Sequence, residues 1–136
     1  MSGAVTGGPR WLLRLEGLVV FVAALIAYRE TGAGWGLFAL VILAPDLAML
    51  GYLTGPRAGA VLYNAAHSYL APAVLGAAGL WLAAPLATNL ALIWIAHIGI
   101  DRALGYGLKY DGGFGLTHLG RVGKAAQDRG SSARRD

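Results

Sequence analysis

The chain has 136 residues, of which 57% are hydrophobic and only 13% are charged, with 11 Lys and Arg, 7 Asp and Glu and no cysteine. A typical soluble domain carries about 25% charged residues, so this composition excludes an ordinary water-soluble globule. The lack of cysteine excludes disulfides, a thiolate-bound metal and a cysteine nucleophile.

The charged residues are distributed as in a membrane protein. No Asp, Glu, Lys or Arg occurs from Ala58 to Ile100, and between Thr31 and Ala58 the only charged residues are Asp46 and Arg57. One bilayer crossing takes about 20 apolar residues. The sequence therefore predicts an integral membrane protein.

Four membrane-spanning helices are expected in chain order, at about 11–28, 35–53, 58–82 and 86–108. Turn and helix-stop signals separate the last three, namely Thr54-Gly55-Pro56-Arg57 and Ala83-Ala84-Pro85. The short connections predict an all-α fold, an antiparallel four-helix bundle. Residues 1–10 are expected to form a polar N-terminal segment. Residues 111–136 are expected to form a cytoplasmic tail with a disordered last dozen residues.

Basic residues near the expected helix ends set the orientation. Arg10, Arg14, Arg57, Arg102 and Lys109 fall on one side, which predicts a multi-pass protein of the inner (cytoplasmic) membrane with both termini in the cytoplasm. Arg10 and Arg14 before an apolar run also fit a signal peptide, but we expect a retained helix. Tryptophans such as Trp94 are expected to anchor helices at the membrane interface.

The same distribution predicts the partners. Basic residues at helix ends are explained by topology and contact with anionic membrane lipid, so no nucleic-acid partner is expected. Small residues at four-residue spacing, such as Gly55 and Gly59, suit close helix contacts and allow a homodimer.

Four ionisable candidates for a site lie inside the expected helices, namely Asp46, His67, His97 and Asp101, whereas Glu16 with Arg14 nearby is expected to be structural. Ionisable residues are costly in a membrane and are functional candidates by default. At about 1.5 Å of rise per residue, all four lie in one layer of the cytoplasmic half. His97 and Asp101, four residues apart, share a helix face.

Two imidazoles and two carboxylates in one layer suit a divalent metal such as Zn, Mn or Fe. Five further residues are expected to support the metal ligands from behind or to contact the substrate, namely Asn64, Ser68, Arg102, Tyr106 and His118. No nucleotide is expected, because the segment Gly105-Tyr106-Gly107 follows no strand. The alternative for each of the four residues is a hydrogen bond or an ion pair that only supports packing.

Several motifs carry a resemblance to a known family. LAPDLAMLGY (43–52), YNAAHSY (63–69), AHIGIDR (96–102) and GYGLKY (105–110), followed by THLG (117–120), resemble domain-of-unknown-function family 4260, a bacterial group of small four-helix membrane proteins. The resemblance covers about residues 13–123. It implies no established activity, but it implies that the four ionisable residues and the pair Thr117-His118 matter to the family.

A looser similarity points toward chemistry. Metal-dependent hydrolases of bacterial inner membranes are similar in carrying a Pro-Asp, a His-Ser and a His followed four residues later by Asp. Here these are Pro45-Asp46, His67-Ser68 and the pair His97 and Asp101. The chain lacks a second acidic residue soon after the Pro-Asp and a His-Arg before the His-Ser, which speaks against a two-metal site.

Three functions stay open at this point. The first is a membrane protein that binds a divalent metal and hydrolyses a lipid-like or amphiphilic substrate through metal-activated water. The second is a non-enzymatic small transporter or ligand-binding bundle with the same polar layer. The third is an assembly protein whose polar residues only join helices.

Overall fold

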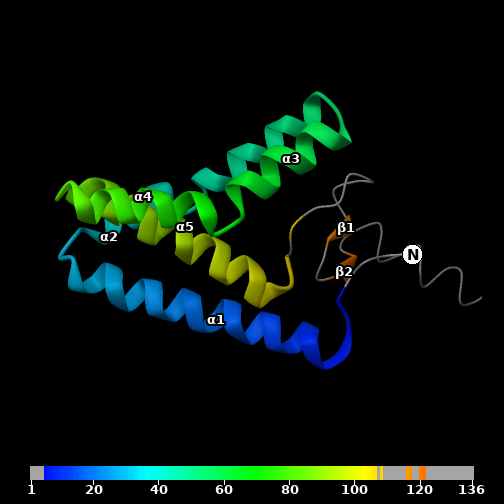
Figure 1. Cartoon of the computed structure of the whole chain (residues 1–136), viewed down its shortest axis with the longest axis horizontal. Helices are drawn as coiled ribbons and strands as arrows, with labels where there is room; N and C mark the ends of the chain where they lie inside the picture. The colour runs from blue at the N-terminus through cyan, green and yellow to red at the C-terminus, as the bar shows by residue number, and fades with distance from the viewer. Residues whose placement is uncertain (1–4, 107, 109–115, 118–119, 122–136) are drawn as a thin grey trace, which may run out of the picture.

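The computed structural model describes residues 5–106, 108, 116–117 and 120–121. This part of the chain is helical, as predicted, apart from one pair of two-residue strands (Figure 1). Its elements are α1 (Gly7–Glu30), α2 (Trp35–Val41), the 3-10 helix η1 (Ala44–Leu53), α3 (Pro56–Ala66), α4 (Leu70–Trp81), α5 (Pro85–Leu104), β1 (Leu116–Thr117) and β2 (Gly120–Arg121). The strands pair antiparallel.

α1 is longer than the predicted 11–28, and a compact turn links it to α2. Tyr28 is fully buried, and its hydroxyl donates to the Gly34 carbonyl at 2.7 Å. Its ring packs against Trp35 and Phe38 with centroid separations of 5.0 and 5.3 Å. The aromatic cluster therefore fixes the direction in which the chain leaves α1.

The second predicted helix, 35–53, is interrupted because of Pro45. Proline has no backbone N–H and its ring clashes with the carbonyl four residues earlier, so α2 stops at Val41. The chain resumes as a 3-10 helix, in which the Asp46 N–H bonds to the Leu43 carbonyl at 3.0 Å. The Ile42 carbonyl, which an α-helix would have paired with the Asp46 N–H, is thereby available to another element.

The third predicted helix, 58–82, is wrong as a single element, because it divides into α3 and α4. Pro72 cannot donate to the carbonyl of residue 68, and the α-helical path through residues 67–69 is lost. α3 starts after Gly55, whose φ of 137° only glycine adopts readily, and it ends at His67.

α5 ends four residues before the predicted position 108. Gly105 adopts a left-handed conformation with φ of 93° and closes the helix. Its N–H bonds to the Arg102 carbonyl at 3.1 Å, and the Tyr106 N–H bonds to the Asp101 carbonyl at 2.8 Å. This pair of bonds is a Schellman motif, which glycine at that position favours.

Glycines let α5 approach both α1 and α4 closely. A Cβ added at Gly99 would lie 2.8 Å from the Phe21 nitrogen and 2.9 Å from the Gly17 oxygen, both in the backbone of α1. A Cβ added at Gly79 of α4 would lie 2.6 Å from the Thr88 hydroxyl of α5. α5 is therefore packed between these two helices.

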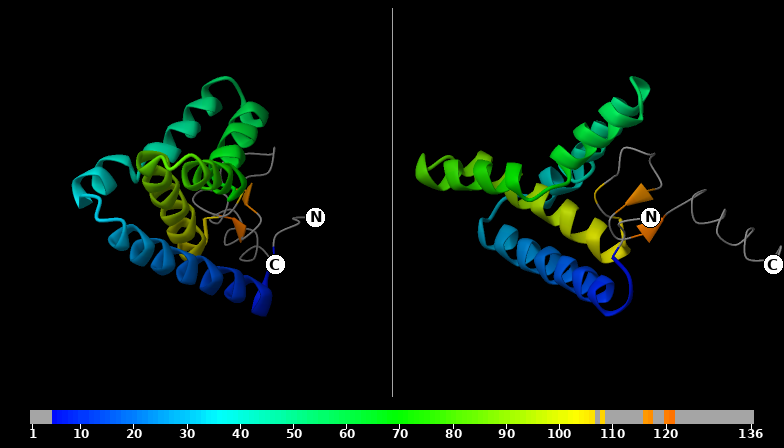
Figure 2. Two further views of the ribbon diagram at one scale, coloured as in Figure 1. Left: turned by 60° about the vertical axis from the view of Figure 1, so that its left-hand side comes forward. Right: turned by 45° about the vertical axis from the view of Figure 1, so that its right-hand side comes forward.

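η1 and α3 form a second packed pair, which projects away from the other helices (Figure 2). Gly59 of α3 lies against the ring of Tyr52 of η1. The helices thus form two packed groups joined near the start of η1 and the end of α3. A single four-helix bundle in a membrane stays a prediction.

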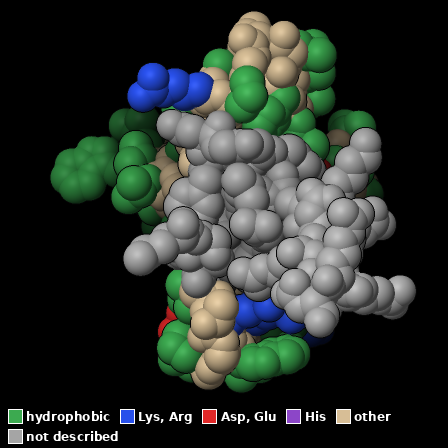
Figure 3. All heavy atoms as spheres, turned by 90° about the vertical axis from the view of Figure 1, so that its right-hand side faces the viewer, with side chains coloured by type: hydrophobic (Ala, Val, Ile, Leu, Met, Phe, Trp, Pro, Cys, Tyr) green, Lys and Arg blue, Asp and Glu red, His purple; other side chains and the backbone are tan. Residues whose placement is uncertain are grey.

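Two stretches among the described residues are long and apolar enough to cross a membrane, Gly7–Glu30 and Trp35–Leu53. Their most apolar windows are only 17% and 0% buried, unlike the core helix of a soluble protein. Large hydrophobic side chains are exposed on all six helices, for example Trp11, Leu40, Leu53, Val61, Trp81 and Leu86. In the view of Figure 3, the described side chains are also mostly hydrophobic.

Candidate metal centre

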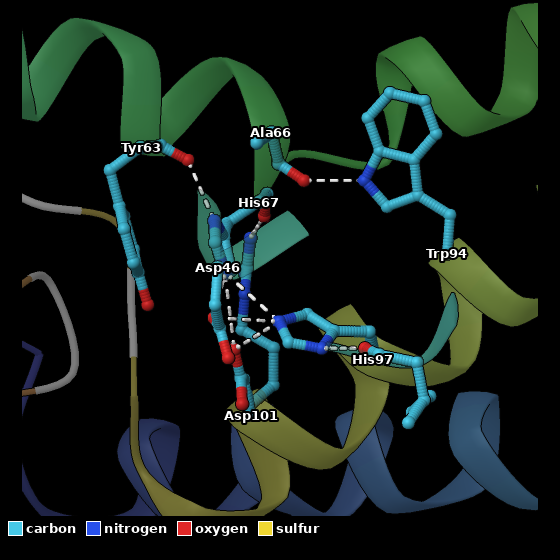
Figure 4. Close-up of polar contacts among 9 residues, drawn as sticks. Asp46, Tyr63, Ala66, His67, Trp94, His97 and Asp101 are labelled. Atoms are coloured by element: carbon cyan, nitrogen blue, oxygen red, sulfur yellow. Dashed lines mark hydrogen bonds and ion pairs between the residues drawn. The ribbon is translucent and has the colours of Figure 1, made fainter. Parts of the chain in front are cut away.

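The four predicted metal ligands converge at the junction of the two helix groups. Asp46 comes from the first turn of η1, His67 from the end of α3, and His97 with Asp101 from α5. Figure 4 shows their side chains pointing toward one another. One ligand atom from each, all within 4.8 Å of one another, forms a group that could hold a metal ion.

The separations within this group match those of ligands around one ion. The two Nε2 atoms are 3.0 Å apart, and His97 Nε2 lies 3.1 Å from both Asp46 Oδ1 and Asp101 Oδ2. His67 Nε2 lies 3.2 Å from Asp46 Oδ1 and 3.4 Å from Asp101 Oδ2. Atoms about 2.0–2.1 Å from one ion are about 3.3 Å apart in tetrahedral and about 2.9 Å apart in octahedral coordination.

Backbone carbonyls determine which nitrogen of each histidine carries the proton. His67 Nδ1 lies 2.9 Å from the Tyr63 carbonyl, and His97 Nδ1 lies 2.6 Å from the Ile42 carbonyl. A carbonyl can only accept, so each Nδ1 donates, and in a neutral imidazole Nε2 then carries a lone pair. Both lone pairs are available to the shared centre, which is the usual arrangement of metal-binding histidines.

The charges and burial of the group also favour a cation. The His67 and His97 side chains are 4% and 3% exposed, whereas those of Asp101 and Asp46 are 18% and 34% exposed. With both imidazoles neutral, the two carboxylates leave the group with two negative charges, and burying such charges without a partner is costly. A divalent cation would neutralise them. The more exposed Asp46 marks the open side of the group.

Neighbouring side chains hold His67 in place. The Tyr63 ring stacks on the His67 ring with a centroid distance of 3.7 Å and an angle of 7°. Arg102 Nη2 donates to the His67 carbonyl at 3.2 Å, and the Trp94 indole N–H donates to the Ala66 carbonyl. These bonds satisfy carbonyls at the break between α3 and α4.

Two of the five residues expected around the metal ligands, Arg102 and Tyr106, contact a ligand residue. Both contacts are to the backbone, Arg102 to His67 and the Tyr106 N–H to Asp101. Asn64 lies one turn before His67 on α3, and Ser68 follows His67 in the break between α3 and α4. His118 lies outside the described residues.

The sequence pattern missed two contributors. Trp94, for which only a role as a membrane-interface anchor was predicted, lies within α5 and donates to the Ala66 carbonyl beside His67. The Ile42 carbonyl, which orients His97, belongs to the backbone, so a pattern of side chains gives no sign of it. The spacing of Trp94 three residues before His97 was the available signal, because it places both on one helix face.

One family model, described as Domain of unknown function (DUF4260), matches residues 10–122. The match covers most of the chain and confirms the resemblance drawn from its motifs. No curated protein and no solved structure matches the chain.

Proposed function

The chain belongs to the DUF4260 family, and for it we propose a membrane-embedded divalent metal centre, formed by Asp46, His67, His97 and Asp101, that hydrolyses an amphiphilic substrate. One observation carries the metal centre. Both histidines donate through Nδ1 to backbone carbonyls, which leaves two Nε2 lone pairs 3.0 Å apart beside two carboxylates. The lone pairs and the carboxylates repel one another, and a cation bound between them would replace this repulsion with attraction.

The helix breaks support placing this centre within a membrane. Non-helical backbone is tolerated at membrane depth only where it is buried in protein or lines a cavity. The breaks at 42–43 and 67–69 both adjoin the cluster, and three carbonyls near them accept side-chain bonds from α5, those of Ile42, Ala66 and His67. We propose four crossings of the inner membrane with both termini in the cytoplasm, α3 and α4 together forming the third.

The ligand set suits hydrolysis if the ion is five- or six-coordinate. Four protein ligands fill a tetrahedral site, whereas a catalytic ion needs an open position for water. Octahedral Mn or Fe, or zinc with an expanded shell, would keep such a position beside Asp46, the most exposed ligand. The ion would then supply hydroxide. Hydrolysis of an ester at such a site would consume one water molecule and yield a carboxylic acid and an alcohol.

Metal content and hydrolysis test the proposal together. Purified wild-type protein in lipid nanodiscs is expected to bind about one divalent ion per chain and to hydrolyse p-nitrophenyl dodecanoate only when loaded. Asp46→Asn keeps the shape of the side chain but removes its charge, and we expect at least tenfold weaker binding, of the order that outer-shell changes already cause, about 10–100-fold. Wild-type metal content no higher than that of the double variant Asp46→Asn, Asp101→Asn would contradict the metal centre.

The assay also separates metal binding from catalysis. Release of p-nitrophenol that is equal in loaded and metal-free protein would remove the hydrolytic part of the proposal. Stoichiometric metal without any hydrolysis of acyl or phosphate esters would favour a metal-binding or transport role for the same cluster.

A further inference from the structure

An apolar cavity of about 360 Å³ lies beside the cluster. Every residue that lines it is hydrophobic, and they come from α2, η1, α3, α4 and α5; they include Pro45, Ala48, Ala66, Leu75, Leu90 and Trp94. The volume lies toward the lower end of the usual range for small-molecule sites, about 300–1,000 Å³. The single polar atom of Trp94 is already bonded to the Ala66 carbonyl, so its ring is left for apolar contact.

Two of the residues that line the cavity are neighbours in sequence of metal ligands. These are Pro45 and Ala66, which immediately precede Asp46 and His67. A ligand that fills the cavity would therefore touch the backbone that carries two of the four metal ligands.

One face of α5 joins the cavity to the metal ligands. Leu90, Trp94, His97 and Asp101 are spaced by four, three and four residues, which places all four on one face of the helix. The first two line the cavity and the last two belong to the cluster. From Leu90 to His97 the helix rises about 10 Å, so apolar and polar sites follow one another along a single path.

From this path we propose that the cavity binds the alkyl chain of a single-chain amphiphile whose polar group lies at the Asp46, His67, His97 and Asp101 cluster. The assignment names the substrate class and rests on the proposed function. No charged or polar side chain lines the cavity. The cavity therefore suits a hydrocarbon chain, whereas a polar group would be buried there without a hydrogen-bond partner.

The positive charge of Arg102 adjoins the polar end of this path. Its guanidinium donates to the His67 carbonyl and lies 5.5 Å from the centre of the Tyr69 ring. Along α5 it is eight residues beyond Trp94, or about 12 Å. The positive charge of Arg102 would therefore attract an anionic head group, such as a phosphate, to the polar end of this helix face, beyond the cavity that holds the alkyl chain.

Photolabelling in lipid nanodiscs tests the cavity. The probe is dodecyl phosphate with a diazirine at the end of its chain, and mass spectrometry locates the labelled residues. We expect label on Leu75, Leu90 and Trp94. Ala48→Phe fills the cavity, and we expect roughly tenfold less label there, because the added ring occupies the volume that the alkyl chain would take.

Matched variants keep the result interpretable. Leu80→Phe adds an aromatic ring to an α4 residue that is 75% exposed, and it should label as wild type does. Leu90→Phe gives a second filled cavity if Ala48→Phe fails to fold. Label spread evenly over exposed residues, or unchanged in both filled variants, would overturn the alkyl-chain site.

The outcomes distinguish this proposal from the metal centre. Cavity labelling in a protein that binds no metal would overturn the metal centre and support the chain site alone. Full metal binding with no cavity labelling would overturn the chain site and leave the metal centre standing.

Discussion

Replacing His97 with Ala is expected to abolish retention of a divalent metal by the purified protein. His97 supplies the Nε2 that lies closest to both carboxylates, at 3.1 Å from each. Changes to outer-shell partners already weaken metal affinity by about 10–100-fold, so loss of a ligand should exceed about 100-fold. The measurement is metal content per chain after gel filtration in metal-free buffer.

The same substitution should make the Tm of the protein independent of added metal. A ligand present at 1,000 times its dissociation constant stabilises a fold by about 4 kcal/mol, which for a chain of this size means about 10 °C or more in Tm. Adding metal should therefore raise the Tm of the wild type and leave that of His97→Ala unchanged. With a chelator present, adding metal should no longer raise the Tm of the wild type, so the wild type and His97→Ala should respond alike.

Asn89→Ala is the matched control for that experiment. Asn89 is also a buried polar residue of α5, 9% exposed, and it lies two turns from His97. It should retain the metal and the metal-dependent rise in Tm. Equal metal content in wild type, His97→Ala and Asn89→Ala would show that the cluster is not the binding site.

Gly99→Val is expected to destabilise the protein by about 3 kcal/mol or more, at the upper end of the cost of overpacking a close contact. The first added carbon would lie 2.8 Å from the Phe21 backbone nitrogen, so α1 and α5 would have to separate. Gly99 stands between His97 and Asp101. We therefore expect metal affinity to fall with Tm, although the substitution touches no ligand.

Gly36→Ala provides the control for added volume. Nothing lies within 4 Å of the Cβ that it would introduce, and alanine is favoured over glycine in helices by about 1 kcal/mol. Its Tm should equal or slightly exceed that of the wild type, as read from a thermal melt in the same nanodiscs. A Gly99→Val protein as stable as Gly36→Ala would contradict the close packing of α1 on α5.

Apolar runs located the helices but not their interruptions. The chain was expected to continue through 35–53 and 58–82, whereas Pro45 and Pro72 divide both. Both prolines are visible in the sequence, but each lies within a run of apolar residues that by itself favours one continuous helix. The cost of a lost backbone bond is acceptable here because side chains of α5 bond the carbonyls near each break.

The chain alone predicts helices in an apolar solvent and singles out a few ionisable residues, because charge is scarce in the stretches that carry them. It also predicts that His97 and Asp101 share a face, since four-residue spacing depends only on helix geometry. Tertiary structure decided the rest. Asp46 and His97 lie 21 and 30 residues from His67. Their meeting depends on the breaks and on glycine contacts between helices, which local spacing does not encode.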